Sequence, residues 1–365
     1  MRTLTVNLGD RSYPIHVGEK LLPHIGEFLQ QVGCRGKVGI VTNPTVAALY
    51  LGPVQEGLSH SGFKVTSILL PDGEEHKNLS ALSTIYDRLI ADRFERDAFI
   101  IALGGGVIGD MAGFAAATLL RGISYVQVPT TLLAQVDSSI GGKTGVNHQG
   151  GKNLIGAFYQ PRLVVVDLEA LRTLPRREFV SGLAEVIKCG IIADPELFAL
   201  LEREMERLLT LEGKLLEQIV AASCAIKARI VEKDEHEADL RSVLNFGHTV
   251  GHALEAATRY GRFLHGEAVA IGMVCAASIS VNQGACAKES FKRIRQLIAA
   301  AELPVRLPSD IRLPDIIKNM EVDKKSAGGR IKFVLCEGIG KTRFHWLSPE
   351  DVGGELTGCV NSARP

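Results

Sequence analysis

The sequence predicts an α/β N-terminal domain with a parallel-rich, Rossmann-like sheet, followed by a mainly α-helical C-terminal domain. The first half of the chain alternates short, β-branched apolar runs with stretches of helical periodicity. After about residue 178, one helical stretch follows another. The length of 365 residues is also sufficient for two domains, because a domain typically takes roughly 100–200 residues.

Six strands are expected in the first half, each a short apolar run, and several of them are bounded by Gly, Pro or Asn. They cover residues 3–8, 38–42, 65–70, 98–103, 124–128 and 163–167. Helical stretches over residues 44–61 and 79–93 separate some of these strands. Strand–helix–strand alternation implies parallel pairing, and ligands of parallel sheets bind beyond the carboxyl ends of the strands.

Residues 129–161 form a different kind of segment, rich in Gly, Ser, Thr, Lys and Asn. Long connections of this kind usually have a function or are disordered. The apolar residues within the segment argue for order, so we expect a long ordered loop with a functional role.

Helices dominate the second half, and proline and glycine mark their ends. They are predicted over residues 178–192, 196–209, 215–232, 243–258, 267–283 and 290–301, with a hairpin over residues 331–346. Pro175 and Pro195 are typical of helix starts, and Gly261 and Gly284 of helix ends. We therefore expect two domains, over residues 1–177 and 178–365.

Composition excludes several classes of partner. Lys and Arg total 41, as do Asp and Glu, so no overall charge attracts nucleic acid or an anionic membrane. Residues 1–10 lack the apolar core of a signal peptide, and no apolar run is long enough to span a membrane. The seven scattered cysteines form no C-x-x-C pair, which favours buried or free thiols in a cytoplasmic protein.

A glycine motif follows the strand predicted over residues 98–103. Gly104, Gly106 and Gly109 fit the pattern G-x-G-x-x-G and lead into a helical stretch. Such glycines let backbone N–H groups and a helix N-terminus approach a pyrophosphate, which indicates a dinucleotide site. The next strand lacks the usual acidic residue for the ribose, so Asn43 and Glu74 are candidates for that contact. The alternative is a tight turn that needs glycine only for packing.

A second phosphate-like motif, over residues 137–144, resembles the end of a P-loop. A P-loop requires glycine at the position of Asp137, and it lies directly between a strand and a helix. Because neither condition is met, we exclude a nucleoside triphosphatase.

Three histidines and one glutamate form a candidate metal site. His248 and His252 are four residues apart and would share one face of a helix, and His265 opens the next helical stretch. A catalytic zinc site needs three imidazole or carboxylate ligands and an open position. Spacing leaves two candidates, His252 and Glu185, for the third ligand beside His248 and His265. The alternative is a histidine pair that only packs or caps.

Several cations could hold an anionic substrate. Lys143 and Lys152, with Asn153, lie in the glycine-rich segment, where they differ from lysines on an ordinary helical surface. Arg121, Lys188 and Arg241 lie near the other candidate sites. A phosphorylated substrate requires several fixed cations, although any single lysine is more often a solvated surface charge.

Six segments together resemble the 3-dehydroquinate synthase family. They are residues 104–110, 128–139, 141–144, 182–188, 244–249 and 265–267. The similarity covers nearly the whole chain in the right order, and the segments over 128–144 and 244–249 are highly specific. The chain departs from the usual pattern at Cys189, Leu119 and Asp239, none of which carries a functional role.

The resemblance implies a reaction of the shikimate pathway of aromatic amino acid biosynthesis. The substrate would be 3-deoxy-D-arabino-heptulosonate 7-phosphate, and the products 3-dehydroquinate and phosphate. The steps would be transient oxidation by NAD, β-elimination of phosphate, reduction, ring opening and an intramolecular aldol reaction. A zinc ion, or cobalt in its place, would act as a Lewis acid.

The resemblance also implies roles for individual residues. The metal ligands would be Glu185, His248 and His265, while His252 would join the hydrogen-bond network around the substrate. The substrate-binding and catalytic residues would be Asp137, Lys143, Asn153, Lys188, Lys227, Arg241, Asn245, His252, Lys332 and Arg121. NAD would contact Asn43, Glu74, Lys77, Gly105, Gly106, Asp110, Thr130, Thr131, Lys143, Lys152, Thr173, Leu174 and Glu178.

Residues 1–177 would thus bind NAD, and residues 178–365 would bind the metal and the substrate. We expect both groups to contact one small molecule. The protein would be a homodimer, and Arg121 would contact the phosphate either within its own chain or across the dimer.

Of three alternatives, two are related enzymes and one is a protein without catalytic activity. A metal-dependent NAD polyol dehydrogenase would release reduced cofactor, but Lys143 and Lys152 favour an anionic substrate. A related sugar-phosphate cyclase would use another substrate, but Asn245 and Lys332 favour the dehydroquinate branch. A catalytically silent NAD-responsive binding protein would not need to retain every candidate ligand.

Overall fold

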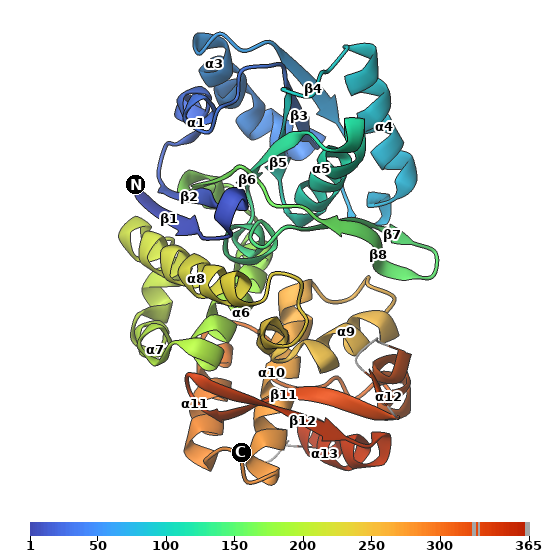
Figure 1. Ribbon diagram of the computed structural model, residues 1–365. Helices are drawn as coiled ribbons and strands as arrows, with labels where there is room; N and C mark the ends of the chain where they lie inside the picture. The colour runs from blue at the N-terminus through green and yellow to red at the C-terminus, as the bar shows by residue number, and fades with distance from the viewer. Residues whose placement is uncertain (323–325, 328, 362–365) are drawn as a thin grey trace. The chain divides into compact units, whose positions relative to one another are not determined.

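The computed structural model describes residues 1–322, 326–327 and 329–361 (Figure 1). These form two compact units. We call the first, Met1–Leu174 with Leu216–His236, the N-terminal unit, and the second, Pro175–Leu215 with Glu237–Pro365, the C-terminal unit. Most of helix α8 (Gly213–Lys233) belongs to the N-terminal unit, so each unit is formed by two segments of the chain. The division of functions between residues 1–177 and 178–365 stays a prediction.

The N-terminal unit is built on a mixed sheet with the order β1-β2-β9-β6-β5-β3-β4. Every neighbouring pair from β2 to β4 is parallel, and only β1 runs antiparallel to its neighbour β2. This confirms the predicted parallel-rich α/β fold. The strands are β1 (Arg2–Val6), β2 (Tyr13–Gly18), β3 (Val38–Thr42), β4 (Val65–Leu69), β5 (Phe99–Gly104), β6 (Ser124–Pro129) and β9 (Leu163–Asp167). Strand β2 is absent from the prediction.

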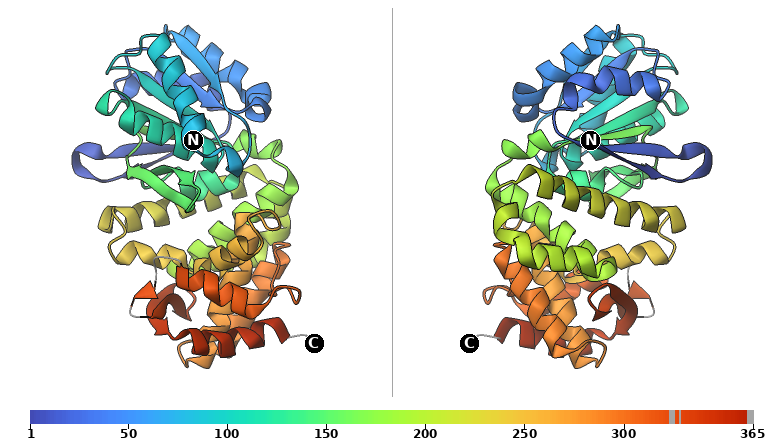
Figure 2. Two further views of the ribbon diagram at one scale, coloured as in Figure 1. Left: turned by 90° about the vertical axis from the view of Figure 1, so that its right-hand side faces the viewer. Right: turned by 90° about the vertical axis from the view of Figure 1, so that its left-hand side faces the viewer.

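Helices cover both faces of this sheet, and β5 shows how. Ile100 and Ala102 pack into a core with α4 and α5, whereas Ile101 and Leu103 pack into another with α1 and α3. Because successive side chains of a strand point to opposite faces, a strand covered on both sides must be apolar throughout. Figures 1 and 2 show the two helix layers. The helices are α1 (Ile25–Gln31), α3 (Gly52–His60), α4 (Leu79–Ala91) and α5 (Gly106–Thr118).

The segment expected as a long loop, residues 129–161, contains more secondary structure than predicted. It includes a short π-helix, η6 (Ala134–Ser138), and an antiparallel hairpin of β7 (Lys143–His148) and β8 (Gly151–Phe158). The expectation of a loop was therefore wrong for the hairpin. Glycine is needed here for close strand approach, since a Cβ at Gly145 would lie 2.5 Å from the carbonyl oxygen of Ile155.

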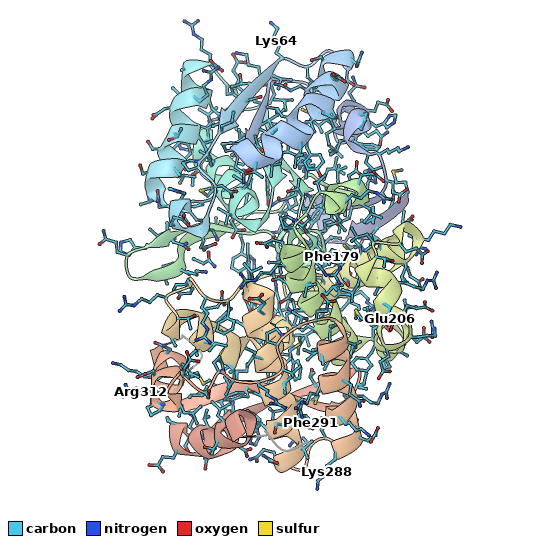
Figure 3. The ribbon with its side chains drawn as sticks, turned by 180° about the vertical axis from the view of Figure 1, so that it is seen from behind. Lys64, Phe179, Glu206, Lys288, Phe291 and Arg312 are labelled. Atoms are coloured by element: carbon cyan, nitrogen blue, oxygen red, sulfur yellow. The ribbon has the colours of Figure 1, made fainter. Side chains whose placement is uncertain are left out.

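Helices and a small sheet make up the C-terminal unit, as predicted. The helices are α6 (Arg176–Ala193), α7 (Pro195–Leu209), α9 (His248–Ala257), α10 (His265–Asn282), α11 (Lys288–Ala300), α12 (Leu313–Val322) and α13 (Pro349–Asn361). The sheet joins β10 (Ser326–Ala327), β11 (Arg330–Gly338) and β12 (Lys341–Leu347). Helices α12 and α13 are additions to the prediction. Phe179 is buried inside this unit, while the side chains of Lys288 and Arg312 are exposed at its surface (Figure 3).

Glycines bring α9 and α10 unusually close together. The predicted helix over 243–258 is interrupted at Gly247, whose φ of 83° lies in the left-handed region, so α9 begins only at His248. A Cβ at Gly272 of α10 would lie 1.9 Å from the carbonyl oxygen of Gly247. Gly247 therefore sets the start of α9, and Gly272 lets α10 pack closely against it; each of the two helices carries a histidine of the candidate metal site.

Within the described part of the chain, no helix combines the length and the apolar character needed to cross a membrane. All seven cysteines are buried thiols, as expected. A cytoplasmic location stays a prediction.

Candidate active site

The dinucleotide-type site lies at the carboxyl edge of the N-terminal sheet. The chain passes from β3 to β4 in one direction across the sheet and from β5 to β6 in the other, so β3 and β5 flank the point where the order reverses. Ligands of open α/β sheets bind at such a switch point. Asn43 follows β3 directly, and Gly105 and Gly106 follow β5. The structure thus brings these three predicted NAD residues to one edge.

The glycine motif connects β5 to α5. Gly105 has an extended conformation and directly precedes α5. The N–H groups in the first turn of a helix have no hydrogen-bond partner inside the helix, so they are available to a ligand. A Cβ at Gly109 would lie 2.8 Å from Gln127 Oε1, so this glycine permits close packing of α5 on β6. The backbone N–H of Thr130 donates to the carbonyl of Gly104 at 3.0 Å. Gly109 therefore has the close-packing role of the third glycine in the fingerprint, and a pyrophosphate contact at Gly105 and Gly106 stays a prediction.

A polar network lies beside the glycine motif. The ammonium of Lys77, only 4% exposed, donates to Asp110 Oδ2 and to Asn153 Oδ1, each at 2.5 Å. Burial raises the pKa of the Asp110 carboxyl, and the positive charge of Lys77 opposes that rise. Glu74 lies 3.6 Å from the ammonium of Lys152. Five of the predicted site residues therefore converge here.

A second pair of predicted residues links α8 to η6. The ammonium of Lys227 donates to the backbone carbonyl of Asp137 at 2.6 Å and to its Oδ1 at 2.5 Å. The thiol of Cys224, one turn earlier on α8, donates to the carbonyl of Gln135 at 3.3 Å. Lys143 begins strand β7 in the same unit.

The candidate metal ligands converge in the C-terminal unit. Nε2 of His248 lies 3.5 Å, and Nε2 of His265 lies 3.7 Å, from Oε1 of the buried Glu185. One donor atom from each of the three lies within 4.8 Å of the others. The opposite ring nitrogens are held too: Nδ1 of His248 lies 3.3 Å from the carbonyl of Phe246, and Nδ1 of His265 lies 3.3 Å from Glu255 Oε2. Metal-binding histidines usually have such a second anchor.

His252, the other candidate left open by spacing, lies close by. Its ring centroid is 5.2 Å from that of His248 and 5.9 Å from that of His265. His252, Glu255 and His265 form a second group with donor atoms within 4.8 Å of one another. The two groups share His265, and the group that contains Glu185 is the more buried.

Four other predicted substrate residues lie in the C-terminal unit, and one of them contacts the cluster directly. Lys188 forms a buried ion pair with Glu185, one turn away on α6. Arg241 is 1% exposed and is the largest fully buried side chain among the residues that the structure describes. Asn245 Nδ2 donates to Glu237 Oε1 at 2.9 Å. The ammonium of Lys332 lies 3.9 Å from the ring centroid of Phe344.

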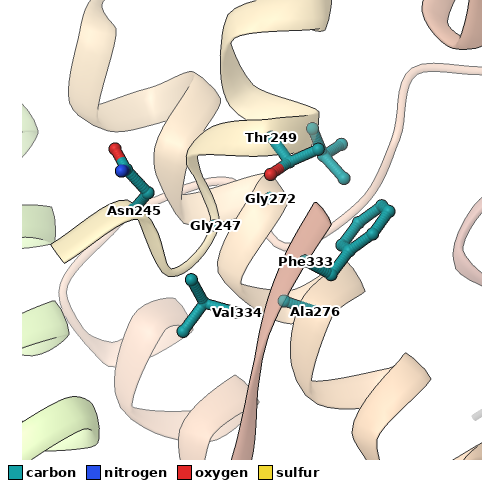
Figure 4. Close-up of a pocket in the computed structure, with 8 residues that line it drawn as sticks. Asn245, Gly247, Thr249, Gly272, Ala276, Phe333 and Val334 are labelled. Atoms are coloured by element: carbon teal, nitrogen blue, oxygen red, sulfur yellow. The ribbon is translucent and has the colours of Figure 1, made fainter. Parts of the chain in front are cut away.

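A small pocket lies beside these residues (Figure 4). It is lined by Asn245, Gly247, Thr249, Val250, Gly272, Ala276, Phe333 and Val334. Apart from the amide of Asn245 and the hydroxyl of Thr249, the lining is apolar or glycine. Because the lining includes none of the three histidines, this pocket is not the metal site.

The remaining predicted residues have other contacts, and Thr131 lies against the glycine motif, since a Cβ at Gly105 would be 3.2 Å from its Cγ2. Arg121 is exposed and has a φ of 69°, and Leu120 before it has a φ of 52°. Such left-handed conformations cost energy for residues other than glycine. The Thr173 hydroxyl contacts that of Tyr50, and Leu174 ends the first segment of the N-terminal unit. Glu178 lies in the first turn of α6, and the hydroxyl of Thr131 caps the backbone N–H of Ala134.

Sequence reasoning missed two residues with prominent contacts. Glu255 lies seven residues after His248 and three after His252, so helical spacing alone would have placed it on the same face of α9. Asn147 contacts three predicted site residues from an irregular position in β7, and no single-sequence pattern marks it.

Comparison with known proteins gives the family. A family model for the 3-dehydroquinate synthase N-terminal region matches residues 67–181, and one for the C-terminal region matches residues 182–326. A 3-dehydroquinate synthase from Geobacter metallireducens is 54% identical over 341 residues, which cover 93% of this chain and 94% of that protein. The chain belongs to the 3-dehydroquinate synthase family. The predicted resemblance is therefore confirmed.

Solved structures of related cyclases share the fold of this 3-dehydroquinate synthase family member. A 2-deoxy-scyllo-inosose synthase, in complex with carbaglucose-6-phosphate, NAD+ and Co2+, matches with a TM-score of 0.91 and 26% identity, covering 98% of this chain and 100% of its own. A 2-epi-5-epi-valiolone synthase from Streptomyces hygroscopicus, with NAD+ and Zn2+ bound, matches with a TM-score of 0.87 and 26% identity, covering 98% and 99%.

Proposed function

We propose that this protein converts 3-deoxy-D-arabino-heptulosonate 7-phosphate to 3-dehydroquinate and phosphate, with NAD and a divalent metal as cofactors. Family membership over nearly the full chain supports the reaction. One observation carries the proposal: the same chain has a donor set for a metal, formed by Glu185, His248 and His265, and a glycine turn of the dinucleotide-binding type. A metal donor set and a nucleotide-binding strand edge are the two parts that this reaction requires.

The donor set fits a catalytic metal. Glu185 is 1% exposed; one carboxylate oxygen contacts the Lys188 ammonium, and the other faces Nε2 of His248 and of His265 at 3.5 and 3.7 Å. A buried carboxylate oxygen that faces two imidazole nitrogens is a donor set typical of a catalytic zinc site. Glu185, His248 and His265 would hold zinc or cobalt and leave a position open for substrate oxygens. The bound metal would supply Lewis acidity. Related cyclases hold Co2+ or Zn2+.

The carboxyl edge of the N-terminal sheet fits NAD. Gly105 and Gly106 let the pyrophosphate approach the N-terminus of α5, where the helix dipole favours negative charge. When bound, NAD would supply a reversible hydride acceptor. The surrounding contacts would come from Asn43, Glu74, Lys77, Asp110, Thr130, Thr131, Lys143, Lys152, Thr173, Leu174 and Glu178.

Fixed cations would bind the anionic substrate. Lys188 and Arg241 are buried, where an ionic contact is stronger than in bulk water. His252 would donate to or accept from a substrate hydroxyl beside the metal ligands. The remaining contacts would come from Asp137, Lys143, Asn153, Lys227, Asn245, Lys332 and Arg121. We also propose a homodimer, in which the exposed Arg121 is available to the substrate of the partner subunit.

A related sugar-phosphate cyclase is the second candidate function. The TM-score of 0.91 to a 2-deoxy-scyllo-inosose synthase favours it, because the two folds are almost the same. The 54% identity to a 3-dehydroquinate synthase, against 26% to that cyclase, favours the first proposal.

Product analysis tests the substrate. We expect the purified protein, with NAD and zinc, to convert the heptulosonate phosphate to 3-dehydroquinate and phosphate in equal amounts, as followed by NMR and a phosphate assay. Hexose 6-phosphates serve as the control and should release no phosphate. Turnover of a hexose phosphate, with none of the heptulosonate phosphate, would assign the chain to another branch of the cyclases.

A further inference from the structure

We propose that Asn147 is a positioning residue that holds the predicted NAD-binding and substrate-binding side chains of the N-terminal unit in one arrangement. The inference rests on the proposed function and adds a residue to it. The pairing of β7 with β8 shifts register between Val146 and His148, so Asn147 lies at a bulge. Its backbone N–H donates outside the hairpin, to the carbonyl of Lys77 at 2.8 Å.

The side chain of Asn147 uses both ends of its amide. Nδ2 donates to Glu74 Oε1 at 2.8 Å, and Oδ1 accepts from the backbone N–H of Asn153 at 2.9 Å. Asn153 has a φ of 54°, in the left-handed region, which asparagine adopts more readily than most residues other than glycine. The amide of Asn147 is one of the groups that hold it.

Lys77 closes these contacts into a ring. Its backbone carbonyl accepts from Asn147, and its ammonium donates to Asn153 Oδ1 and Asp110 Oδ2. Asn147 therefore bonds separately to Glu74, Lys77 and Asn153. The first two are predicted NAD contacts and the third is a predicted substrate contact, so one side chain couples the two sets.

Only an amide satisfies both partners of the Asn147 side chain. Glu74 requires a donor, and the N–H of Asn153 requires an acceptor. Aspartate at position 147 would have no N–H to donate to Glu74. It would also place a second carboxylate against that of Glu74, where the hydrogen bond now measures 2.8 Å. Alanine would lose both bonds.

The experiment measures NAD+ binding by calorimetry, and the KM for heptulosonate phosphate, on the zinc-loaded protein. We expect Asn147→Asp to weaken NAD+ binding about tenfold and to raise that KM, because the new carboxylate would face the Glu74 carboxylate where a hydrogen bond now joins the two side chains. Asn147→Ala should change both quantities in the same direction. The matched control is Asn282→Asp, an exposed residue at the end of α10 whose Nδ2 donates to Glu355 Oε2 at 2.6 Å. The control should change neither quantity.

A reversal variant separates positioning from loss of fold. Combining Asn147→Asp with Glu74→Gln exchanges donor and acceptor and restores their bond. The double variant should bind NAD+ no more weakly than Glu74→Gln alone. Unchanged NAD+ binding and KM in Asn147→Asp, or a lowered melting temperature with both unchanged, would overturn the inference and leave the proposed function standing. A wild-type protein that neither binds NAD+ nor releases phosphate would overturn both.

Discussion

Replacing His248 with alanine will remove bound zinc and stop turnover. The substitution deletes one of the three candidate ligands, whose Nε2 lies 3.5 Å from Glu185 Oε1. Lewis-acid stabilisation by a metal contributes several kcal/mol, so phosphate release should fall at least about 1000-fold. Elemental analysis after dialysis, with a phosphate-release assay on the same sample, measures both effects. A chelator should have the same effect on the wild-type protein.

His252→Ala is the matched comparison, because spacing alone leaves His252 and Glu185 open as the third ligand. If Glu185 is the ligand, His252→Ala keeps its zinc, while Glu185→Gln loses it. Zinc lost from His252→Ala but retained in Glu185→Gln would assign the metal to the group of His252, Glu255 and His265.

Replacing Lys77 with methionine will cost about 3 kcal/mol of unfolding free energy, as is usual when one partner of a buried ion pair is removed. Lys77 is 4% exposed, and its ammonium is 2.5 Å from Asp110 Oδ2. The variant leaves that carboxylate without its nearest positive charge and also removes a bond to Asn153. Chemical denaturation with urea measures the loss.

The pH dependence of this loss has a definite sign. Because burial raises the pKa of Asp110, the folded protein holds a proton that the unfolded chain releases above about pH 4. Stability from the protonated carboxyl is complete below that pH and is lost as pH rises through the folded pKa. Without Lys77 the folded pKa rises further, so the difference between variant and wild type should grow from pH 4 toward neutral pH.

Two variants control this experiment. Lys64→Met removes an exposed lysine of the same unit, which projects from the surface in Figure 3, and should leave stability unchanged. Adding Asp110→Asn to Lys77→Met removes the uncompensated charge and should recover part of the lost stability. Equal stability of Lys77→Met and wild type at neutral pH would contradict the importance of this pair.

Patterns that depend on neighbours along the chain predicted most of the fold. Strands such as β3 and β5 are apolar throughout because helices cover both faces of the sheet, and this requirement shows in the sequence. The glycine turn after β5 was predicted for the same kind of reason, since Gly104–Gly109 must permit close approach within a few residues. The hairpin of β7 and β8 was missed because Gly145 and its polar neighbours are also typical of loops.

Features that depend on contacts between distant segments could not be predicted from spacing. His248 and His252 fit one helix face, but Glu185 comes from α6, more than 60 residues earlier in the numbering, and only the resemblance to the family favoured it over His252. The bonds of Asn147 to Glu74 and Lys77 likewise join segments about 70 residues apart, from β7 to the turn after β4. No local pattern specifies such pairings.

The central claim is that this protein is a phosphate-eliminating lyase and not a dehydrogenase. The most direct test is the ratio of NADH formed to phosphate released. Absorbance of NADH and released phosphate are followed together with NAD in small excess over enzyme and substrate in large excess. We predict many phosphates released per enzyme while NADH never exceeds the amount of enzyme. NADH that accumulates in proportion to product, or turnover that ceases once the added NAD is reduced, would contradict the account.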